Sequence, residues 1–389
     1  MRQLNTYLLS LGISRFVTAV MLVCAIAFSS IVSAAAKVEK EVPSIKSIVK
    51  KANSEKMIQS GLLVIAREGK ILFTQSYGYA DRDQKSIMTI DTLFPLGSIS
   101  KQFTAALILK LVEMKKIDLN APIDTYLENV PKEWHQITVH DLLTHTNGLR
   151  ECYDLLKYSA PYDRDACLVA VKPLPLTHVP GKTFEYNNTG YFLLAKIIEK
   201  VTGKSYPDFI KQTLNKPLHL THIYSPNIEG EYPSAVYQKD RLAKHYLITP
   251  EAGKIEYAKA NETNLNFAHY LTGAGELIGS ANDLIAWTQA LFESDYLTKN
   301  SLDKMKTKYI YDEEKRRWYG YGLCIRESEV GDVYFHAGKI DRNGTLFMAY
   351  VPRSKLQLII LSNAYEKDYN PLPIFDYGVG LVVALSKVL

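Results

Sequence analysis

The positions of its strand-like runs constrain the fold of this 389-residue chain most strongly. Residues 61–67 and 70–77 are two apolar runs on either side of Glu68-Gly69, a pair typical of a hairpin turn. Further strand-like runs lie near the carboxyl end, over residues 321–326, 332–336, 345–351 and 356–361. Because such runs occur near both ends of the chain, we expect them to join in one antiparallel sheet.

The middle of the chain has a different pattern. Residues from about 118 to 270 read as mostly helical with long loops, and 193–201 is a clear amphipathic helix closed by Thr202-Gly203. Residues 374–389 are apolar at helical spacing and are expected to pack on the sheet. The sequence therefore predicts an α+β fold with flanking helices. In it, the sheet part (about 37–117 and 271–389) surrounds a mostly helical insertion (about 118–270).

Ser98 and Lys101 lie at the start of a long apolar helical run, 102–112. Three residues span about one helical turn, so the amine lies on the same face as the hydroxyl. A serine hydroxyl is a poor nucleophile until a base takes its proton. The N–H groups at a helix start also point toward any developing oxyanion. The pattern indicates acyl transfer, and the alternative is that Ser98 simply caps the helix.

The same Ser-x-x-Lys spacing occurs at two other places. Ser47 and Lys50 lie in a Lys-rich amphipathic stretch, residues 45–58, which is typical of a solvated surface helix. Ser301 and Lys304 are followed by surface charge and not by an apolar helix. We expect both of these matches to be accidental.

Two later segments complete a recognisable set. Tyr186-Asn187-Asn188 follows the turn at Pro180-Gly181, and His336-Ala337-Gly338 ends a strand-like run. Together with Ser98–Lys101, in this order and at these separations, they resemble the serine β-lactamase and penicillin-binding-protein superfamily. The resemblance is to its class C β-lactamase, D-Ala-D-Ala carboxypeptidase and esterase branch, and it covers about residues 45–365. Further similar stretches are residues 141–149, which include Thr144-His145-Thr146, and residues 273–277 and 319–322.

The resemblance implies a role for each motif residue. Ser98 would attack a carbonyl carbon and form an acyl-enzyme, and Lys101 and Tyr186 would share the proton transfers, with the identity of the base left open. Asn188 would hydrogen-bond Lys101 and the substrate amide. Taken alone, Tyr186 and Asn188 are better read as turn residues, and His336 as a half-buried strand histidine; the three motifs in order favour the catalytic reading.

The third motif would form the rest of the site. The backbone N–H groups of Ser98 and Lys339 would form the oxyanion hole, and Gly338 would let the substrate lie against the strand edge. His336 takes the place that lysine holds in many β-lactamases. Lys339 and Arg342 stand where many relatives carry small residues, and the planar guanidinium of arginine suits a carboxylate. We therefore expect Arg342 to favour substrates with a free carboxylate.

The predicted function is that of a serine hydrolase that needs no cofactor. Its substrates would be D-Ala-D-Ala-type peptides, β-lactams or small esters, with D-alanyl-D-alanine carboxypeptidase or β-lactamase-related activity expected first. The alternative is a non-catalytic binding or scaffold member of the same fold. The presence of Ser98, Lys101, Tyr186 and Asn188 together argues against that alternative, since a scaffold has no chemical need for all four.

Residues 1–36 resemble a secretion signal, with positive charge at Arg2 and Arg15 and an apolar run over 16–32. The sequence thus predicts a periplasmic or secreted protein without stable membrane insertion, and the alternative is an uncleaved membrane anchor. Removing these residues lowers the formal net charge from +5 to about +3. Such a mild charge does not indicate a nucleic-acid partner.

An oxidising compartment would allow a disulfide between Cys152 and Cys167, and unpaired thiols are the alternative. Cys324 lies in an apolar run and is expected to be a buried, inert thiol. His219 and His222 have no carboxylate or cysteine at ligand spacing, so the sequence predicts no metal site.

Overall fold

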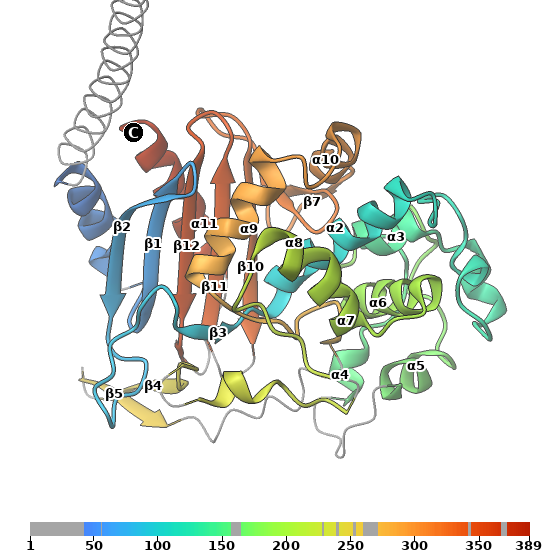
Figure 1. The fold of residues 1–389 in the computed structure, drawn as a ribbon, viewed down its shortest axis with the longest axis horizontal. Helices are drawn as coiled ribbons and strands as arrows, with labels where there is room; N and C mark the ends of the chain where they lie inside the picture. The colour runs from blue at the N-terminus through green and yellow to red at the C-terminus, as the bar shows by residue number, and fades with distance from the viewer. Residues whose placement is uncertain are drawn as a thin grey trace, which may run out of the picture.

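The computed structural model describes residues 43–55, 57–156, 165–227, 229–238, 241–251, 254–259, 271–340, 344–366 and 372–389. The sequence-predicted secretion signal, residues 1–36, lies outside these ranges. Within them, a large sheet lies beside a mostly helical part, and helix α2 (Ser100–Glu113) runs between the two (Figure 1).

The sheet confirms the predicted α+β fold built from both chain ends. In the described part of the chain it has eight strands in the order β2-β1-β12-β11-β10-β9-β8-β7, and every neighbouring pair is antiparallel. The strands are β1 (Gly61–Arg67), β2 (Lys70–Tyr77), β7 (Ile310–Asp312), β8 (Arg317–Tyr319), β9 (Cys324–Arg326), β10 (Val333–Ile340), β11 (Gly344–Val351) and β12 (Leu356–Ser362).

The first hairpin has the residues that its turn requires. Glu68 and Gly69 both have positive φ, 52° and 74°, as a type I′ turn demands. Strand β1 is buried on both faces: Leu62 belongs to one core and Leu63 to the other. This two-sided burial explains why the strand is a continuous apolar run instead of alternating with polar residues.

Helices cover both faces of the sheet. A helix over residues 43–52 and helix α11 (Leu372–Ser386) pack on one face, and α2 and α9 (Ala281–Glu293) pack on the other. The carboxyl-terminal helix is thus where the sequence predicts it. The helix 43–52 is less solvated than expected, because Ile45 and Val49 on its inner face are buried in the core.

The helical part is assembled mainly from short helices. Its longest helix is α6 (Asn188–Thr202), which the Asn187 side chain caps and Gly203, at φ 66°, terminates. The other elements are η3 (Ile123–Thr125), η4 (Lys132–Gln136), α3 (Val139–Thr144), α4 (Cys152–Leu156), α5 (Ala166–Val171), α7 (Tyr206–Ile210), η5 (Lys211–Asn215), α8 (Lys216–Leu218) and η6 (Ser234–Tyr237).

The predicted helical insertion differs from the structure at its far end. Strands β4 (Tyr246–Glu251) and β5 (Lys254–Lys259) pair antiparallel there, and β13 (Ala364–Glu366) pairs parallel with β4. Six residue pairs join β4 to β5 and three join β13 to β4, so most of this small sheet is a local hairpin in a segment that the sequence predicts as helix and loop. The remaining elements are η1 (Asn53–Glu55), β3 (Leu93–Pro95), β6 (Ile278–Ser280) and α10 (Lys299–Lys306).

The predicted strand 321–326 is shorter in the structure. Strand β9 begins at Cys324 and not at 321, because Gly322 adopts a φ of 66°, which no strand residue has. Cys152 and Cys167 form the disulfide that the sequence allows, which joins α4 to α5.

Within the described ranges, none of the helices combines the length and the apolar character needed to span a membrane.

Candidate active site

Ser98 lies in η2 (Gly97–Ile99), a single 3-10 turn just before α2. The sequence predicts that the helix begins at this residue, and the α-helix in fact begins two residues later. Leu96 and Ile99 occupy the N-cap positions of η2 and α2, and neither helix has a side-chain cap. Ser98 is therefore not a helix cap. It is partly exposed between buried neighbours, as a nucleophile must be to reach a substrate.

The Lys101 side chain is fully buried beside Ser98. Its Nζ atom lies 3.2 Å from Ser98 Oγ, 2.7 Å from Asn188 Oδ1 and 2.8 Å from the carbonyl oxygen of Ala274. A neutral amine has two N–H donors and one lone pair. Asn188 and Ala274 can only accept here, so they take the two N–H groups and leave the lone pair directed at the Ser98 hydroxyl.

Burial also favours the neutral form of this amine. Desolvation lowers the pKa of Lys101 to about 7, while the negative charges of Glu151 and Glu276 partly oppose the shift. The rings of Tyr186 and Tyr191 lie 4.8 Å and 5.5 Å from Nζ and enclose it. A substantial fraction of neutral amine is therefore present near pH 7.

The second motif reaches Lys101 from the start of α6. Asn187 caps that helix, which places Tyr186 just before it and Asn188 at its first residue. The Tyr186 hydroxyl makes no regular hydrogen bond to the described residues, although Ser98 lies near enough to lower the pKa of the phenol slightly. Burial dominates and raises the pKa of Tyr186 well above its usual value. The phenol thus keeps its proton, which suits a proton donor better than a resting base.

Two carboxylates near Lys101 were not anticipated from the sequence. Glu151 accepts a hydrogen bond from the backbone N–H of Asn188 at 2.6 Å. Glu276 is buried in the loop before β6, and burial raises its pKa to about 7. Both lie outside the three motifs, and although Glu276 belongs to the similar stretch 273–277, the sequence assigns neither carboxylate a place beside Lys101.

The third motif lies on β10, beside η2. Strand β10 pairs with β9 only over residues 333–335, so its edge from His336 onward is not covered by β9. A Cβ on Gly338 would come within 2.2 Å of the Leu96 carbonyl oxygen. This close approach brings the backbone of Lys339 alongside the turn that carries Ser98. The Lys339 side chain is exposed, and Arg342 lies outside the described residues, so the specificity role of Arg342 stays a prediction.

His336 is only 2% exposed, and its ring centroid lies 6.3 Å from that of Tyr186. Its Nδ1 atom lies 2.7 Å from the carbonyl oxygen of Ala337, and its Nε2 atom lies 3.2 Å from Tyr319 Oη. Burial, assisted by the charges of Lys101 and Arg317, lowers the pKa of His336 to about 3. The ring is therefore neutral at pH 7 and does not supply the positive charge that a lysine would bring to this position.

The other two Ser-x-x-Lys matches lack this geometry. Ser47 and Lys50 are exposed on the helix 43–52. In α10, Lys304 donates to Asn300, while Ser301 accepts a hydrogen bond from Thr298. Among the three matches, Ser98 and Lys101 are the pair that is held together with a second motif.

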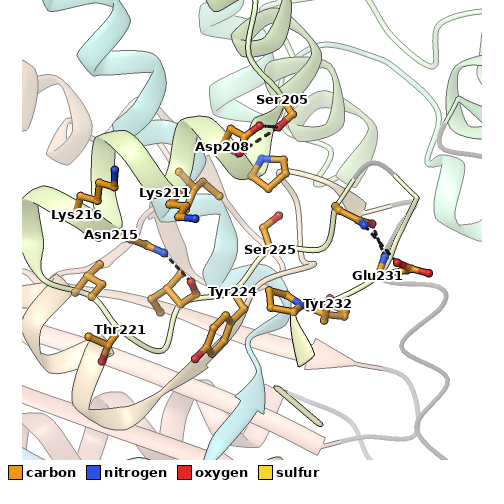
Figure 2. A pocket seen from close by; sticks show the side chains of 16 residues that line it. Ser205, Asp208, Lys211, Asn215, Lys216, Thr221, Tyr224, Ser225, Glu231 and Tyr232 are labelled. Atoms are coloured by element: carbon orange, nitrogen blue, oxygen red, sulfur yellow. Dashed lines mark hydrogen bonds between the residues drawn. The ribbon is translucent and has the colours of Figure 1, made fainter. Parts of the chain in front are cut away.

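A separate cavity of about 880 Å³ lies between α7, η5 and the segment 220–233 (Figure 2). Ser225 and Tyr232 line it, and the Tyr232 hydroxyl donates to the carbonyl oxygen of Glu276. None of the predicted catalytic residues is among its described lining residues. Among the residues that the structure describes, no cluster of three or more His, Cys, Asp or Glu side chains could hold a metal ion.

Gly338→Ala tests the close approach of β10 to η2. The added methyl group meets a backbone carbonyl, so one of the two segments must shift, and we expect a loss of about 1–3 kcal/mol in stability. The shift moves the Ser98 turn, so turnover should fall as well. Gly380→Ala is the matched control, since its new Cβ meets nothing within 4 Å. Thermal unfolding and ester turnover measure both effects, and wild-type turnover in Gly338→Ala would contradict the close approach.

Comparisons with known proteins agree with this geometry. The Beta-lactamase family model matches residues 45–374. Penicillin-binding protein 4* of Bacillus subtilis is 29% identical over 325 residues, which is 80% of this chain and 70% of that protein. The octameric penicillin-binding protein homologue from Pyrococcus abyssi has a TM-score of 0.72 at 26% identity and covers 88% of this chain and 77% of its own.

The fold also extends to an amidase. The D-amino acid amidase of Ochrobactrum anthropi superposes with a TM-score of 0.75 at 22% identity, over 90% of this chain and 100% of the amidase, a likeness of fold alone. Relatives in the family can be longer: the chain spans 65% and 61% of the length of two further matches. The chain belongs to the β-lactamase and penicillin-binding-protein family of serine hydrolases.

Proposed function

We propose that this protein hydrolyses amide or ester bonds through an acyl-enzyme on Ser98, with Lys101 as the base. One observation carries the proposal: two acceptors fix the N–H groups of Lys101, and the third direction of its Nζ atom points at Ser98 Oγ, 3.2 Å away. Because burial lowers the pKa of the amine toward neutrality, the base is present without first losing a proton to solvent.

The proposed reaction has two halves. In the first, the Ser98 proton passes to Lys101 Nζ while Oγ bonds to the substrate carbonyl carbon. The developing oxyanion lies near the backbone N–H groups of Ser98 and Lys339, and one such donor contributes about 3 kcal/mol. Tyr186 then gives its phenolic proton to the departing amine or alcohol and regains one from Lys101. In the second half, water attacks the acyl-enzyme by the same proton route and releases Ser98.

The proposed substrates are D-Ala-D-Ala-type peptides, β-lactams, small amides and small esters. A penicillin-binding relative and an amidase of the same fold support this range. Beyond residue 335 strand β10 is no longer paired with β9, and this part of the strand lies beside η2, which carries Ser98, so an extended substrate would lie along it.

The purified protein should be given a fluorescent penicillin, a chromogenic cephalosporin, a D-amino acid amide and a p-nitrophenyl ester. We expect turnover of the ester and a covalent adduct with at least one β-lactam. The substrate with the highest kcat/KM defines the class. If none of the probes is turned over or bound covalently, the protein is the non-catalytic member of the fold that the sequence leaves as the alternative.

The pH dependence of kcat/KM should report the Lys101 amine. A lysine is a base only when deprotonated, so the rate should rise about tenfold per pH unit below the pKa of about 7 and level off above it. His336, with its pKa of about 3, is neutral throughout pH 5–9 and adds no inflection. The measurement uses a neutral ester, and a rate that is flat from pH 5 to 9 would contradict the assignment.

Glu276→Gln distinguishes titration of Lys101 from titration of the neighbouring carboxyl group of Glu276, whose pKa burial raises to about 7. Its negative charge raises the pKa of Lys101, so neutralising it should move the rising limb to lower pH. If titration of Glu276 itself causes the rise of kcat/KM with pH, that rise should instead disappear in this variant.

A further inference from the structure

Two histidines and a tyrosine outside the reach of solvent connect the two halves of the site. His145 ends α3 in a left-handed conformation at φ 59°, Tyr319 ends β8, and His336 lies on β10. All three side chains are buried. His145 and Tyr319 have no role in the reaction described above, so their close contact calls for an explanation.

The hydrogen bonds among them run in one direction only. The Ala337 carbonyl can only accept, so the proton of the neutral His336 ring is on Nδ1 and its Nε2 atom is an acceptor. The Tyr319 hydroxyl therefore donates to His336 Nε2 at 3.2 Å. The Tyr319 hydroxyl has only one proton, which it donates to His336, so Tyr319 Oη accepts a hydrogen bond from His145 Nε2 at 3.1 Å.

The second ring nitrogen of His145 has a partner that fits this direction of donation. His145 Nδ1 is then unprotonated, and it accepts the backbone N–H of Asn187 at 3.3 Å. Burial lowers the pKa of both His145 and His336, so both rings are neutral, as this pattern requires. Each ring nitrogen has one partner in this arrangement, and each donor faces an acceptor.

The two ends of this series lie in the catalytic motifs. Asn187 stands between Tyr186 and Asn188, and Ala337 precedes Gly338 on the strand beside Ser98. The His145 ring also lies against the Tyr186 ring, with centroids 4.2 Å apart and planes 36° apart. The same residues thus hold the second motif to the third and support the face of the Tyr186 phenol.

We propose that His145 and Tyr319 are positioning residues that, with His336, form a directed hydrogen-bond relay across the seam between the helical part and the sheet. The relay holds Tyr186 in register with Ser98 and keeps the proton of His336 on Nδ1, directed at Ala337 and away from the substrate. This inference rests on the proposed hydrolase function, which the Ser98 labelling described in the Discussion tests separately.

Nitrogen-15 NMR of the histidine rings at pH 7 tests the relay without any assay of activity. We expect His336 as the Nδ1–H tautomer and His145 as the Nε2–H tautomer, assigned from the signals lost in His336→Gln and His145→Gln. A charged ring or the opposite tautomer at either position would overturn the relay even if Ser98 is acylated as proposed.

Tyr319→Phe removes the central hydroxyl and leaves both ring nitrogens without it. We expect kcat for the ester to fall about tenfold or more through misplacement of Tyr186, with KM within about twofold of wild type. Tyr206→Phe is the matched control, because it removes an equally buried hydroxyl, bonded to Thr104, without touching the relay. Equal kcat in the two variants would show that Tyr319 is merely structural.

A pair of substitutions at His145 gives a second test should Tyr319→Phe fold poorly. Glutamine can present an N–H group near the position of His145 Nε2, whereas alanine cannot. Both substitutions place a side chain at the positive φ of residue 145, so the backbone strain is similar in the two variants. His145→Gln should therefore retain several-fold more kcat than His145→Ala. Equal losses in the two variants would contradict a role for the hydrogen bond from His145 to Tyr319.

Discussion

Ser98→Ala should abolish turnover of every substrate that the protein accepts, with kcat reduced about 10⁴-fold or more. The oxygen that forms the acyl-enzyme is absent, so Lys101 has no hydroxyl group to deprotonate. The fold should survive, because the Ser98 side chain is partly exposed and caps neither neighbouring helix.

Intact-mass spectrometry with a β-lactam or an activated ester provides the direct measurement. The wild-type protein should gain the mass of one acyl group, and peptide mapping should place it on Ser98. Ser47→Ala is the matched control, since it removes the serine of another Ser-x-x-Lys pair from an exposed position on the helix 43–52. It should label and turn over like wild type. An adduct on Ser47 or Ser301 would contradict the assignment of the nucleophile.

Lys101→Met and Tyr186→Phe should each lower the acylation rate by about 10²-fold or more. The first removes the amine that lies 3.2 Å from Ser98 Oγ, and the second removes the proton proposed for the leaving group. The two residues handle one proton in succession, so the double variant should be little slower than the worse single variant. Stopped-flow acylation rates under single-turnover conditions measure all three.

Lys110→Met is the control for the lysine substitution. Lys110 is on the same helix and is partly buried, but its Nζ atom bonds Glu113 and the carbonyl of Tyr296, away from Ser98. Its acylation rate should stay within about twofold of wild type. Losses that multiply fully in the Lys101→Met, Tyr186→Phe double variant would mean that the two residues act independently, which contradicts a shared proton path.

Local sequence pattern was enough to predict much of the fold. Glu68-Gly69 between two apolar runs predicts the first hairpin, and helical spacing predicts α6 and α11, because side-chain periodicity and turn chemistry act over a few residues. The order and spacing of Ser98–Lys101, Tyr186–Asn188 and His336–Gly338 likewise indicated the family and the members of the site. Pattern and structure disagree at β4 and β5, where the expected helical insertion contains a short hairpin whose first strand also pairs with the distant β13.

Only the tertiary structure decided how the members of the site lie relative to one another. Lys101 becomes a candidate base because folding buries its amine and supplies acceptors from Asn188 and Ala274, 87 and 173 residues away. His145 and Tyr319 lie in stretches that the family resemblance includes, but their hydrogen bond, like that of Glu151 to Asn188, joins segments far apart in the sequence. The sequence by itself determined which side chains are present and which short elements carry them. The packing of the sheet against the helical part determined their distances, their hydration and hence their protonation states, because desolvation and hydrogen-bond partners arise only when remote segments meet.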